Sequence, residues 1–377
     1  MKTIDEINKK IEEGKAVVVT ATEFKKMAEE ESKKDIAKKV DVVTTATFSP
    51  MCSSGVFLNI GHTTPHMKMQ DVTLDGVKAY GGIATVDIYL GATEESETDP
   101  KYGGAHVIHK LIKGEKIKIK ANGKPSDCYP GSKLDSEFTL DEINQAYFYN
   151  PRNCYQNYNA AYNSSDKTMY TYMGLLEPEG KTVNFAGSGE ISPLLNDPYL
   201  RTIGLGTKLF FCGGTGYVTW EGTQFNNGTE RDEKTGLPIG PAATIAISAE
   251  LRGLNPKYIK PVYIPGYGVS IYLSVAMGIP VIDEEMAASL SIKNEDIFTN
   301  VYDYASGNNV KKASYSQLIN SELTINSKKV RCRTMSKIRE SYEIMELLKA
   351  EILKGKFSLT EPVTPIPFYG KVNQFKG

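Results

Sequence analysis

Two cysteines stand in polar, turn-forming segments bounded by proline and glycine: Cys52 in "PMCSSG" and Cys128 in "SDCYPG". A cysteine that only fills core space has apolar neighbours, whereas a thiol that acts as a nucleophile or metal ligand must be able to ionise. Cys52 and Cys128 are therefore candidates for a nucleophile or a ligand, weighed against the alternative that both thiols are inert.

The other three cysteines give weaker signals. Cys212 in "FFCGGTGY" precedes a glycine loop whose backbone amides could stabilise a thiolate or an anion, so core packing and function are both open there. Cys154 lies in an aromatic segment and Cys332 lies between two arginines. For these two positions we favour an inert thiol.

All four histidines fall between positions 62 and 109, in "HTTPH" and "HVIH". Pro65 directly before His66 disfavours the helical geometry that a zinc pair at this spacing needs. His106 and His109 could share a helix face, but no carboxylate completes a hydrolase motif such as HExxH, so the case for a zinc hydrolase is weak. Histidine titrates near neutral pH, and we take His106 as the candidate acid or base for the flanking thiols.

The segment from Phe138 to Tyr172 is dense in tyrosine and asparagine and carries "PRNCYQNY". Such residues offer flat surfaces and amide donors, which predicts a pocket wall or a subunit interface, as in a homodimer. An enzyme that acts on a small zwitterion needs a cationic side chain for the carboxylate and an acidic one for the ammonium group. Arg152, Asn153 and Tyr155 are the candidate substrate-binding residues.

The surrounding pattern predicts an α/β fold, with a mixed α+β arrangement left open. Isoleucines at 4, 7 and 11 predict a first helix, "AVVVTA" a buried strand, Thr22 a cap for a helix over 23–39, and residues 336–354 a last helix. Short alternating runs predict a β-rich insertion near 72–125. We expect one large domain over 1–377, or two intimately packed layers around a mixed sheet, with the site in glycine-rich loops at strand ends.

Composition excludes several functional classes. The 44 basic and 45 acidic residues nearly cancel and form no basic block, which argues against a nucleic-acid partner. "GLGTKL" lacks the third glycine of a dinucleotide fingerprint and no GxxxxGK[ST] occurs, so neither NAD nor ATP is expected. The charged N-terminus and the lack of long apolar runs predict a cytoplasmic protein without a membrane partner.

Several longer segments together resemble one family. They include "VDVVTTATFSPMCSSGVFLNIGH", "YGGIATVDIYLGAT", "NQAYFYNPRNCYQNYNAAYNSSDKTMYTYMG" and "FFCGGTGYV". The chain is similar over nearly its whole length to the homocysteine biosynthesis family of methanogens and other anaerobes, the aspartate semialdehyde sulfurtransferases. The resemblance implies an enzyme that makes L-homocysteine from L-aspartate semialdehyde and sulfide with two electrons, and Cys52 and Cys128 match the family's two functional cysteines.

The resemblance leaves the sulfur carrier open. Two thiols can relay a persulfide, whereas three can hold a [4Fe-4S] cluster with one open iron, and Cys212 is then the expected third ligand beside Cys52 and Cys128. We expect neither the C-terminal regulatory domain nor the ferredoxin module of some relatives, so the electrons should come from a separate ferredoxin-like protein. The alternative function is a non-catalytic iron–sulfur or sulfur carrier.

Overall fold

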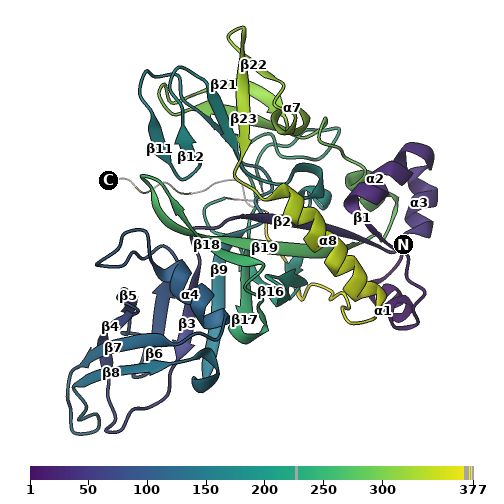
Figure 1. The fold of residues 1–377 in the computed structure, drawn as a ribbon. Coiled ribbons are helices and arrows are strands. Elements are labelled where there is room, and N and C mark those ends of the chain that lie inside the picture. Colours follow the sequence, from purple (N-terminus) through teal and green to yellow (C-terminus); the bar gives the residue numbers. More distant parts are fainter. Residues whose placement is uncertain (226–227, 369–372, 374, 376–377) are drawn as a thin grey trace.

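The structure is a computed structural model that describes residues 1–225, 228–368, 373 and 375. Two β-sheets organise this part of the chain, and helices pack on the larger sheet (Figure 1). The larger sheet runs in the order β1-β2-β19-β15-β16-β17-β9-β3-β6-β5-β4-β7-β8, with β18 paired to β19. Because β1 and β2 are parallel and most other neighbours antiparallel, the sheet is mixed, which confirms the predicted α/β class.

The larger sheet contains β1 (Val18–Thr20), β2 (Val42–Pro50), β3 (Gly55–Asn59), β4 (Met69–Leu74), β5 (Val77–Tyr80), β6 (Asp87–Gly91), β7 (Ile117–Gly123), β8 (Lys133–Phe138), β9 (Gln145–Asn153), β15 (Lys208–Phe211), β16 (Gly214–Glu221), β17 (Ile245–Glu250), β18 (Ile259–Ile264) and β19 (Gly268–Pro280). The smaller sheet contains β21 (Asn308–Ser314), β20 (Phe298–Asp303), β10 (Ala160–Tyr162), β13 (Thr182–Phe185), β23 (Lys328–Thr334) and β22 (Leu323–Ile325), in this order. Two strand pairs stand apart: β11 (Met169–Thr171) with β12 (Gly174–Leu176), and β14 (Gly204–Leu205) with β24 (Thr364–Pro365).

The helices of the described residues are α1 (Ile4–Glu12), α2 (Ala21–Glu30), α3 (Lys33–Lys39), α4 (Gly104–Ile112), α5 (Pro193–Asn196), α6 (Glu284–Leu290), α7 (Tyr315–Ile319) and α8 (Ile338–Leu353), with 3₁₀ turns η1 (Leu140–Glu142), η2 (Gly189–Ile191) and η3 (Leu251–Gly253). The first and last predicted helices are confirmed as α1 and α8. Helix α8 lies across β2 and β19, where both strands are buried (Figure 1). Within the described part of the chain, every helix is too short or too polar to cross a lipid bilayer.

The single helix predicted over 23–39 is wrong, and so is its cap. The hydroxyl of Thr20, not Thr22, accepts a hydrogen bond from the Glu23 amide at 3.2 Å, and the Glu23 carboxylate accepts one from the Thr20 amide at 2.7 Å. Because of this reciprocal capping box, α2 begins at Ala21, two residues before the predicted start at Glu23. The hydroxyl of Ser32 caps α3 by accepting a hydrogen bond from the Asp35 amide at 3.2 Å, and this second N-terminus divides the segment into two helices.

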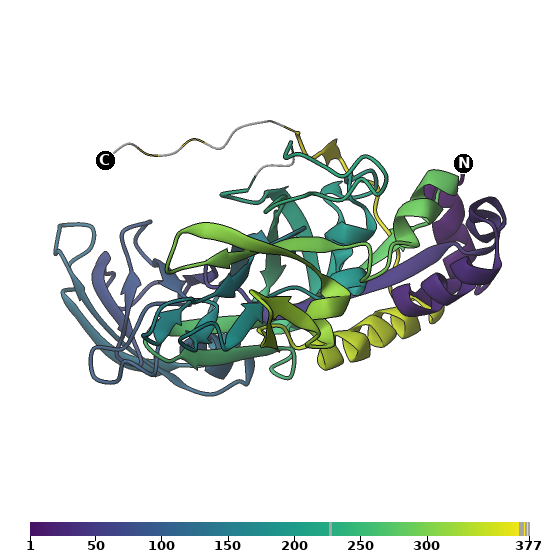
Figure 2. The same ribbon diagram turned by 90° about the horizontal axis from the view of Figure 1, so that it is seen from above.

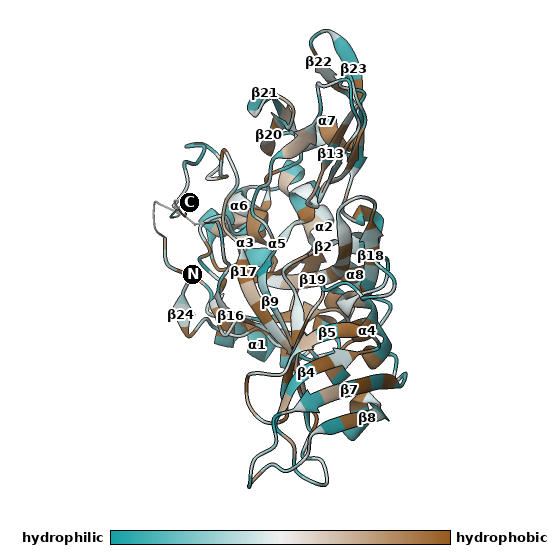
Figure 3. Ribbon diagram, turned by 90° about the vertical axis from the view of Figure 1, so that its left-hand side faces the viewer, coloured by the Kyte–Doolittle hydropathy of each residue, from teal (hydrophilic) through white to brown (hydrophobic). Residues whose placement is uncertain are grey.

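The predicted β-rich insertion near 72–125 forms one end of the larger sheet. It supplies β4 to β7, and β6 joins the rest of the sheet through β3. Buried and exposed residues alternate along β7. Hydrophobic and hydrophilic residues alternate along the same strand in Figure 3. This alternation is typical of a strand with one face on a core, and α4 covers that face.

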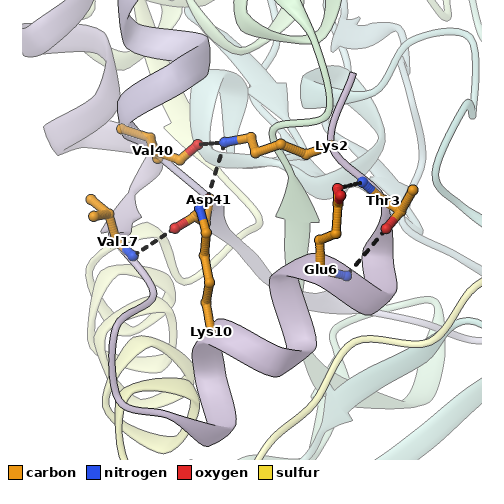
Figure 4. A network of polar contacts seen from close by, with 7 residues as sticks. All are labelled: Lys2, Thr3, Glu6, Lys10, Val17, Val40 and Asp41. Carbon is orange, nitrogen blue, oxygen red and sulfur yellow. Dashed lines mark hydrogen bonds and ion pairs between the residues drawn. The ribbon is translucent and has the colours of Figure 1, made fainter.

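Asp41 ties the N-terminal helix to the sheet (Figure 4). Its carboxylate accepts hydrogen bonds from Lys10 at 2.7 Å, from Lys2 at 3.2 Å and from the Val17 amide at 3.0 Å, while Lys2 also donates to the Val40 carbonyl oxygen. Burial by itself would raise the pKa of Asp41, but these hydrogen bonds and the lysine charges hold the pKa below its usual value. The network fixes α1 beside the start of β2.

Two main hydrophobic cores lie under the two sheets. The larger core joins the long sheet to α1, α2, α4, α6 and α8, and the smaller core joins the six-stranded sheet to α7. The view from above in Figure 2 shows the elongated molecule, with β3 to β8 at one end and α1 to α3 at the other. The two sheets meet beside the end of β2, and the cavity described next lies at this junction.

Candidate functional site

A cavity of about 270 Å³ lies where the two sheets meet. The larger sheet contributes the residues after β2, including Cys52, and the end of β9 with Arg152 and the residues that follow it. The smaller sheet and its neighbours contribute Tyr172 from the β11–β12 turn and Tyr315 from α7. The cavity is therefore built by segments that are far apart in the sequence.

Cys52 lies in a fixed turn at the wall of this cavity. The Ser54 hydroxyl donates to the Met51 carbonyl oxygen at 2.8 Å and accepts from the Asn150 amide group at 2.7 Å, which holds the turn against β9. The Cys52 thiol is 3.1 Å from the Ser270 hydroxyl, and its side chain is half-buried. The thiol is thus held in place yet remains accessible to a ligand.

Tyr267 contacts the same thiol. It lies in the turn between β18 and β19, in the segment "YIPGYGVSIYL" whose glycine turn predicted a strand-end loop. Burial, together with the charge and the hydrogen bond of Cys52, raises the pKa of Tyr267 to about 12. Tyr267 therefore keeps its proton at neutral pH and can donate a hydrogen bond to sulfur.

A second, outer cavity of about 390 Å³ shares Cys52, Arg152 and Tyr267 with the first. It adds Glu95 and Gly268. Gly268 has φ +124°, and a Cβ at this position would lie 2.5 Å from a carboxylate oxygen of Glu95, so only glycine permits this approach. Cys52 thus lines two cavities, and the outer one contains the Glu95 carboxylate.

Arg152 is the cationic group of both cavities. Its Nε donates to the Ser53 hydroxyl at 3.3 Å, and no carboxylate of the described residues forms an ion pair with its guanidinium. Burial raises the pKa of Tyr155 to about 12, although the positive charge of Arg152 acts to lower that pKa. A half-buried guanidinium without a carboxylate partner in a cavity is suited to bind a carboxylate of a ligand.

Neutral phenols form the inner wall. The hydroxyls of Tyr158 and Tyr172 are 2.6 Å apart, and Tyr304 donates to Tyr172 at 2.8 Å. Burial raises the pKa of Tyr158 to about 12 and raises the pKa of Tyr172 as well. The predicted pocket wall in the tyrosine-rich segment thus contributes Tyr155, Tyr158 and Tyr172, of which only the first had been singled out.

Cys128 lies elsewhere. It is exposed in the loop between β7 and β8, and its thiol is 3.5 Å from the Ser126 hydroxyl. In this loop the Gly131 amide donates to the His66 carbonyl oxygen, which places the loop beyond the end of β3. Cys52 precedes the start of β3, and the strand's five residues span about 14 Å. Cys128 does not line either cavity that holds Cys52.

Cys212 does not fit its expected role as a cluster ligand. It is fully buried in the larger core, its thiol donates to the Ser274 carbonyl oxygen at 3.6 Å, and burial raises the pKa of the thiol well above its usual value. A cluster ligand must be a thiolate that reaches its iron, and burial among apolar side chains opposes both conditions. In residues 1–225, 228–368, 373 and 375, no three His, Cys, Asp or Glu side chains lie together as a metal site.

Two further predicted residues have structural contacts. His106 lies in the first turn of α4, where its Nδ1 accepts a hydrogen bond from the Gly103 amide at 3.1 Å; burial lowers its pKa. Asn153 is buried, and its side-chain oxygen accepts from the Cys154 amide at 2.7 Å. Neither residue lines the cavities, so the structure brings together Cys52, Arg152 and Tyr155 from the predicted set.

Comparisons with known proteins agree on one family. Residues 16–359 match the family model described as "Homocysteine biosynthesis enzyme, sulfur-incorporation". The L-aspartate semialdehyde sulfurtransferase of Methanocaldococcus jannaschii is 43% identical over 383 residues, which cover 96% of this chain and 73% of that protein. The L-aspartate semialdehyde sulfurtransferase of Methanosarcina acetivorans is 39% identical over 380 residues, covering 100% and 74%. No solved structure matches the chain.

Proposed function

Because the chain belongs to the homocysteine biosynthesis family of sulfur-incorporating enzymes, we propose that it is an L-aspartate semialdehyde sulfurtransferase. The observation that carries this proposal is the shared position of Cys52 and Arg152 in both cavities. A thiol beside an unpaired guanidinium is what the addition of sulfur to a small aldehyde with a carboxylate requires.

The substrate is a zwitterion with an aldehyde at the other end. We place its α-carboxylate on Arg152 and its α-ammonium group near the Glu95 carboxylate, so that the aldehyde carbon points toward the Cys52 sulfur. Opposite charges at fixed positions orient the substrate and convert the sulfur addition into a reaction between neighbouring groups. Tyr155 and the other neutral phenols then form the wall behind the aldehyde.

We propose a persulfide on Cys52 as the sulfur carrier. Its terminal sulfur forms a bond to the aldehyde carbon, and cleavage of the sulfur–sulfur bond by two electrons returns the Cys52 thiolate. Loss of water from the resulting thiohemiacetal and addition of two electrons and two protons gives the thiol. The outer sulfur of the persulfide is sulfane sulfur, and we propose that polysulfide or another persulfide transfers it to the Cys52 thiolate. From the loaded Cys52, the whole sequence consumes four electrons and four protons and releases one water.

This chain's residues have defined tasks in that sequence. Tyr267 donates a hydrogen bond to the sulfur of Cys52, which stabilises the thiolate as it leaves. Arg152 holds the substrate, and the phenols of Tyr158 and Tyr172 can donate to the departing oxygen. We propose a separate ferredoxin-like protein as the electron source. We propose no step on an iron–sulfur cluster, because Cys212, the expected third ligand, lies buried in the core.

The test is production of homocysteine by the purified chain, under anaerobic conditions, from L-aspartate semialdehyde, polysulfide as the sulfane-sulfur donor and a chemical reductant. Mass spectrometry should detect homocysteine with the wild type and with Cys332→Ser, a half-buried cysteine of β23 that serves as the matched control. Cys52→Ser should abolish product while the thermal midpoint stays unchanged. Full activity of Cys52→Ser would overturn the assignment.

The alternative function, a sulfur carrier without catalysis, makes a different prediction. A carrier has no use for a cavity that binds an amino-acid aldehyde, so L-aspartate semialdehyde should not change its thermal midpoint. The enzyme should be stabilised by the substrate, and the stabilisation should disappear in Arg152→Ala. A sulfur-loaded protein that is never stabilised by the aldehyde would favour the carrier.

A further inference from the structure

One face of the larger sheet carries a row of exposed aromatic side chains that the proposed function does not use. These side chains come from five strands: β5, β6, β3, β9 and β16. In the sheet these strands lie in this order, with β17 between β9 and β16. Figure 1 shows the strands of this sheet. We call this row the aromatic face, and it consists of Tyr80, Tyr89, Phe57, Tyr147, Tyr149, Tyr217 and Trp220.

Strand register shows that these side chains share one face. Phe57 pairs directly with Tyr89 on β6 and with Tyr147 on β9, and Tyr80 pairs with Tyr89. Directly paired residues of antiparallel strands point to the same side of the sheet. Across β17 the row continues, because Ser248 pairs with both Tyr149 and Tyr217.

The opposite face of the same strands is already covered. Val56, Leu58 and Phe148, which alternate with the aromatic residues, are buried in the larger core. Five side chains of the aromatic face, by contrast, are between 40% and 63% exposed. Soluble monomers rarely expose a continuous apolar surface of this extent, and such a surface typically marks an interface.

The charged residues beside the aromatic side chains limit the kind of partner that this face can bind. Three charged residues pair directly with its aromatic residues: Glu250 opposite Tyr147, Lys208 opposite Tyr217 and Asp71 opposite Tyr80. Glu250 accepts a hydrogen bond from Arg252 at 2.7 Å, and the Lys208 ammonium lies 4.3 Å from the centre of the Phe357 ring. The charges opposite Tyr147 and Tyr217 thus have partners within the chain, and the exposed Asp71 lies at the end of the row, beside Tyr80.

We infer that the aromatic face binds a second copy of this chain and forms a two-fold symmetric dimer. In such a dimer the same surface faces itself, which a neutral aromatic surface tolerates and a charged one opposes. An aromatic side chain carries about 150–250 Å² of surface, so the five most exposed ones, at about half exposure, supply roughly 500 Å² per subunit. This is most of the roughly 800 Å² that a stable interface takes from each partner, and the residues between them add to it.

Trp220 provides a direct readout, because it is the only tryptophan of the chain. The molar mass by light scattering should be twice 41.5 kDa at high concentration and fall on dilution. The emission maximum of Trp220 should shift to longer wavelength over the same concentrations, as the indole becomes exposed to water. Because this experiment uses the wild-type chain, it does not depend on the folding of a variant.

Tyr147→Asp places two charges at the centre of the interface and should raise the dimer dissociation constant about tenfold or more. Leu353→Asp is the matched control: Leu353 is equally exposed, lies at the end of α8, outside the aromatic face, and should leave the dimer intact. Circular dichroism checks that both variants fold. A wild type that is monomeric at every concentration would overturn the proposal. So would a dimer whose mass and Trp220 emission stay unchanged both on dilution and in Tyr147→Asp.

Discussion

Cys52 and Cys212 show how strongly the surroundings of a thiol decide its chemistry. Both follow an apolar strand and precede glycine or serine residues, and the sequence suggested a reactive role for each. Cys52 lies in a cavity beside Tyr267 and Arg152, whereas Cys212 is enclosed in the core with its thiol on a backbone carbonyl oxygen. The same residue type is therefore accessible in one place and inert in the other.

This contrast predicts opposite effects of two matched substitutions. Cys212→Ala should reduce the free energy of unfolding by about 1–2 kcal/mol, because it leaves a small cavity in the core, and should leave turnover per folded molecule unchanged. Cys52→Ala should instead abolish turnover with little change in stability. Urea unfolding and homocysteine assays on both variants measure this, and loss of turnover in fully folded Cys212→Ala would return the residue to the active site.

The placement of the substrate charges gives a second prediction. Arg152→Ala should raise KM for L-aspartate semialdehyde about 30-fold or more, since it removes a charge-assisted contact to the carboxylate. Glu95→Gln should raise KM about threefold to tenfold, a smaller effect because Glu95 is exposed to solvent. Glu94→Gln, the neighbouring exposed carboxylate that does not line the cavity, is the control.

Succinic semialdehyde, which has the same chain without the amino group, tests the role assigned to Glu95. Arg152→Ala should raise KM for both aldehydes. Glu95→Gln should raise KM only for L-aspartate semialdehyde, which has the ammonium group. Equal losses for both aldehydes in Glu95→Gln would contradict the proposed contact.

At the scale of the elements, the docking of α1 depends on Asp41 at the start of β2. Its hydrogen bonds come from two lysines and a backbone amide, and its pKa lies below its usual value in the folded chain. A carboxyl with a lowered pKa stabilises the folded state at pH values above the unfolded pKa, near 4, and this stabilisation is lost as pH falls through the folded pKa. The network therefore strengthens the fold near neutral pH and weakens below about pH 4.

Asp41→Asn should accordingly lower the free energy of unfolding by about 2 kcal/mol at pH 7, the usual scale for a charged hydrogen-bond partner. The difference from the wild type should shrink as pH falls below about 4, because the wild-type carboxyl is then protonated. Urea unfolding at a series of pH values measures this difference. A gap that stays constant down to pH 3 would mean that the charge of Asp41 does not support the helix.

At the scale of the whole molecule, the cavity joins two hydrophobic cores. Cys52 and Arg152 belong to the larger sheet, whereas Tyr315 belongs to the core of the smaller one. A ligand in the inner cavity contacts both parts at once, and its binding energy therefore adds to the stability of their junction.

Saturating L-aspartate semialdehyde should thus stabilise the chain by about 2.7 kcal/mol at one hundred times its dissociation constant, and both sheets should become protected together. Hydrogen exchange, read separately for β2 and for β10 with β13, measures this protection. Gly91→Ala is a control for the assay, because, apart from Gly91 and its two chain neighbours, no atom lies within 4 Å of the position that a Cβ would take there. This variant should show the same protection by the ligand as the wild type. Protection confined to one sheet would place the ligand away from the junction.

The sequence by itself determined the features that depend on local pattern. The α/β class, the helices α1 and α8, the alternating strands near 72–125 and the position of Cys52 in a turn all follow from periodicity, capping residues and turn chemistry over a few neighbouring positions. The family resemblance followed from long segments and is confirmed by the match over 16–359. The capping box at Thr20 was present in the sequence but was assigned two residues too late.

Only the tertiary structure decided which residues meet. Tyr267 lies beside Cys52 because β19 pairs with β2 along the whole of β2, and Glu95 shares the outer cavity because β6, which precedes it, pairs with β3. Cys128 is held away because β3 separates its loop from the Cys52 turn. For Cys212 the sequence left core packing and function both open, and β15 and β19 bury it. Such long-range pairings arise from the packing of the whole sheet, and no short stretch of sequence carries the information that sets them.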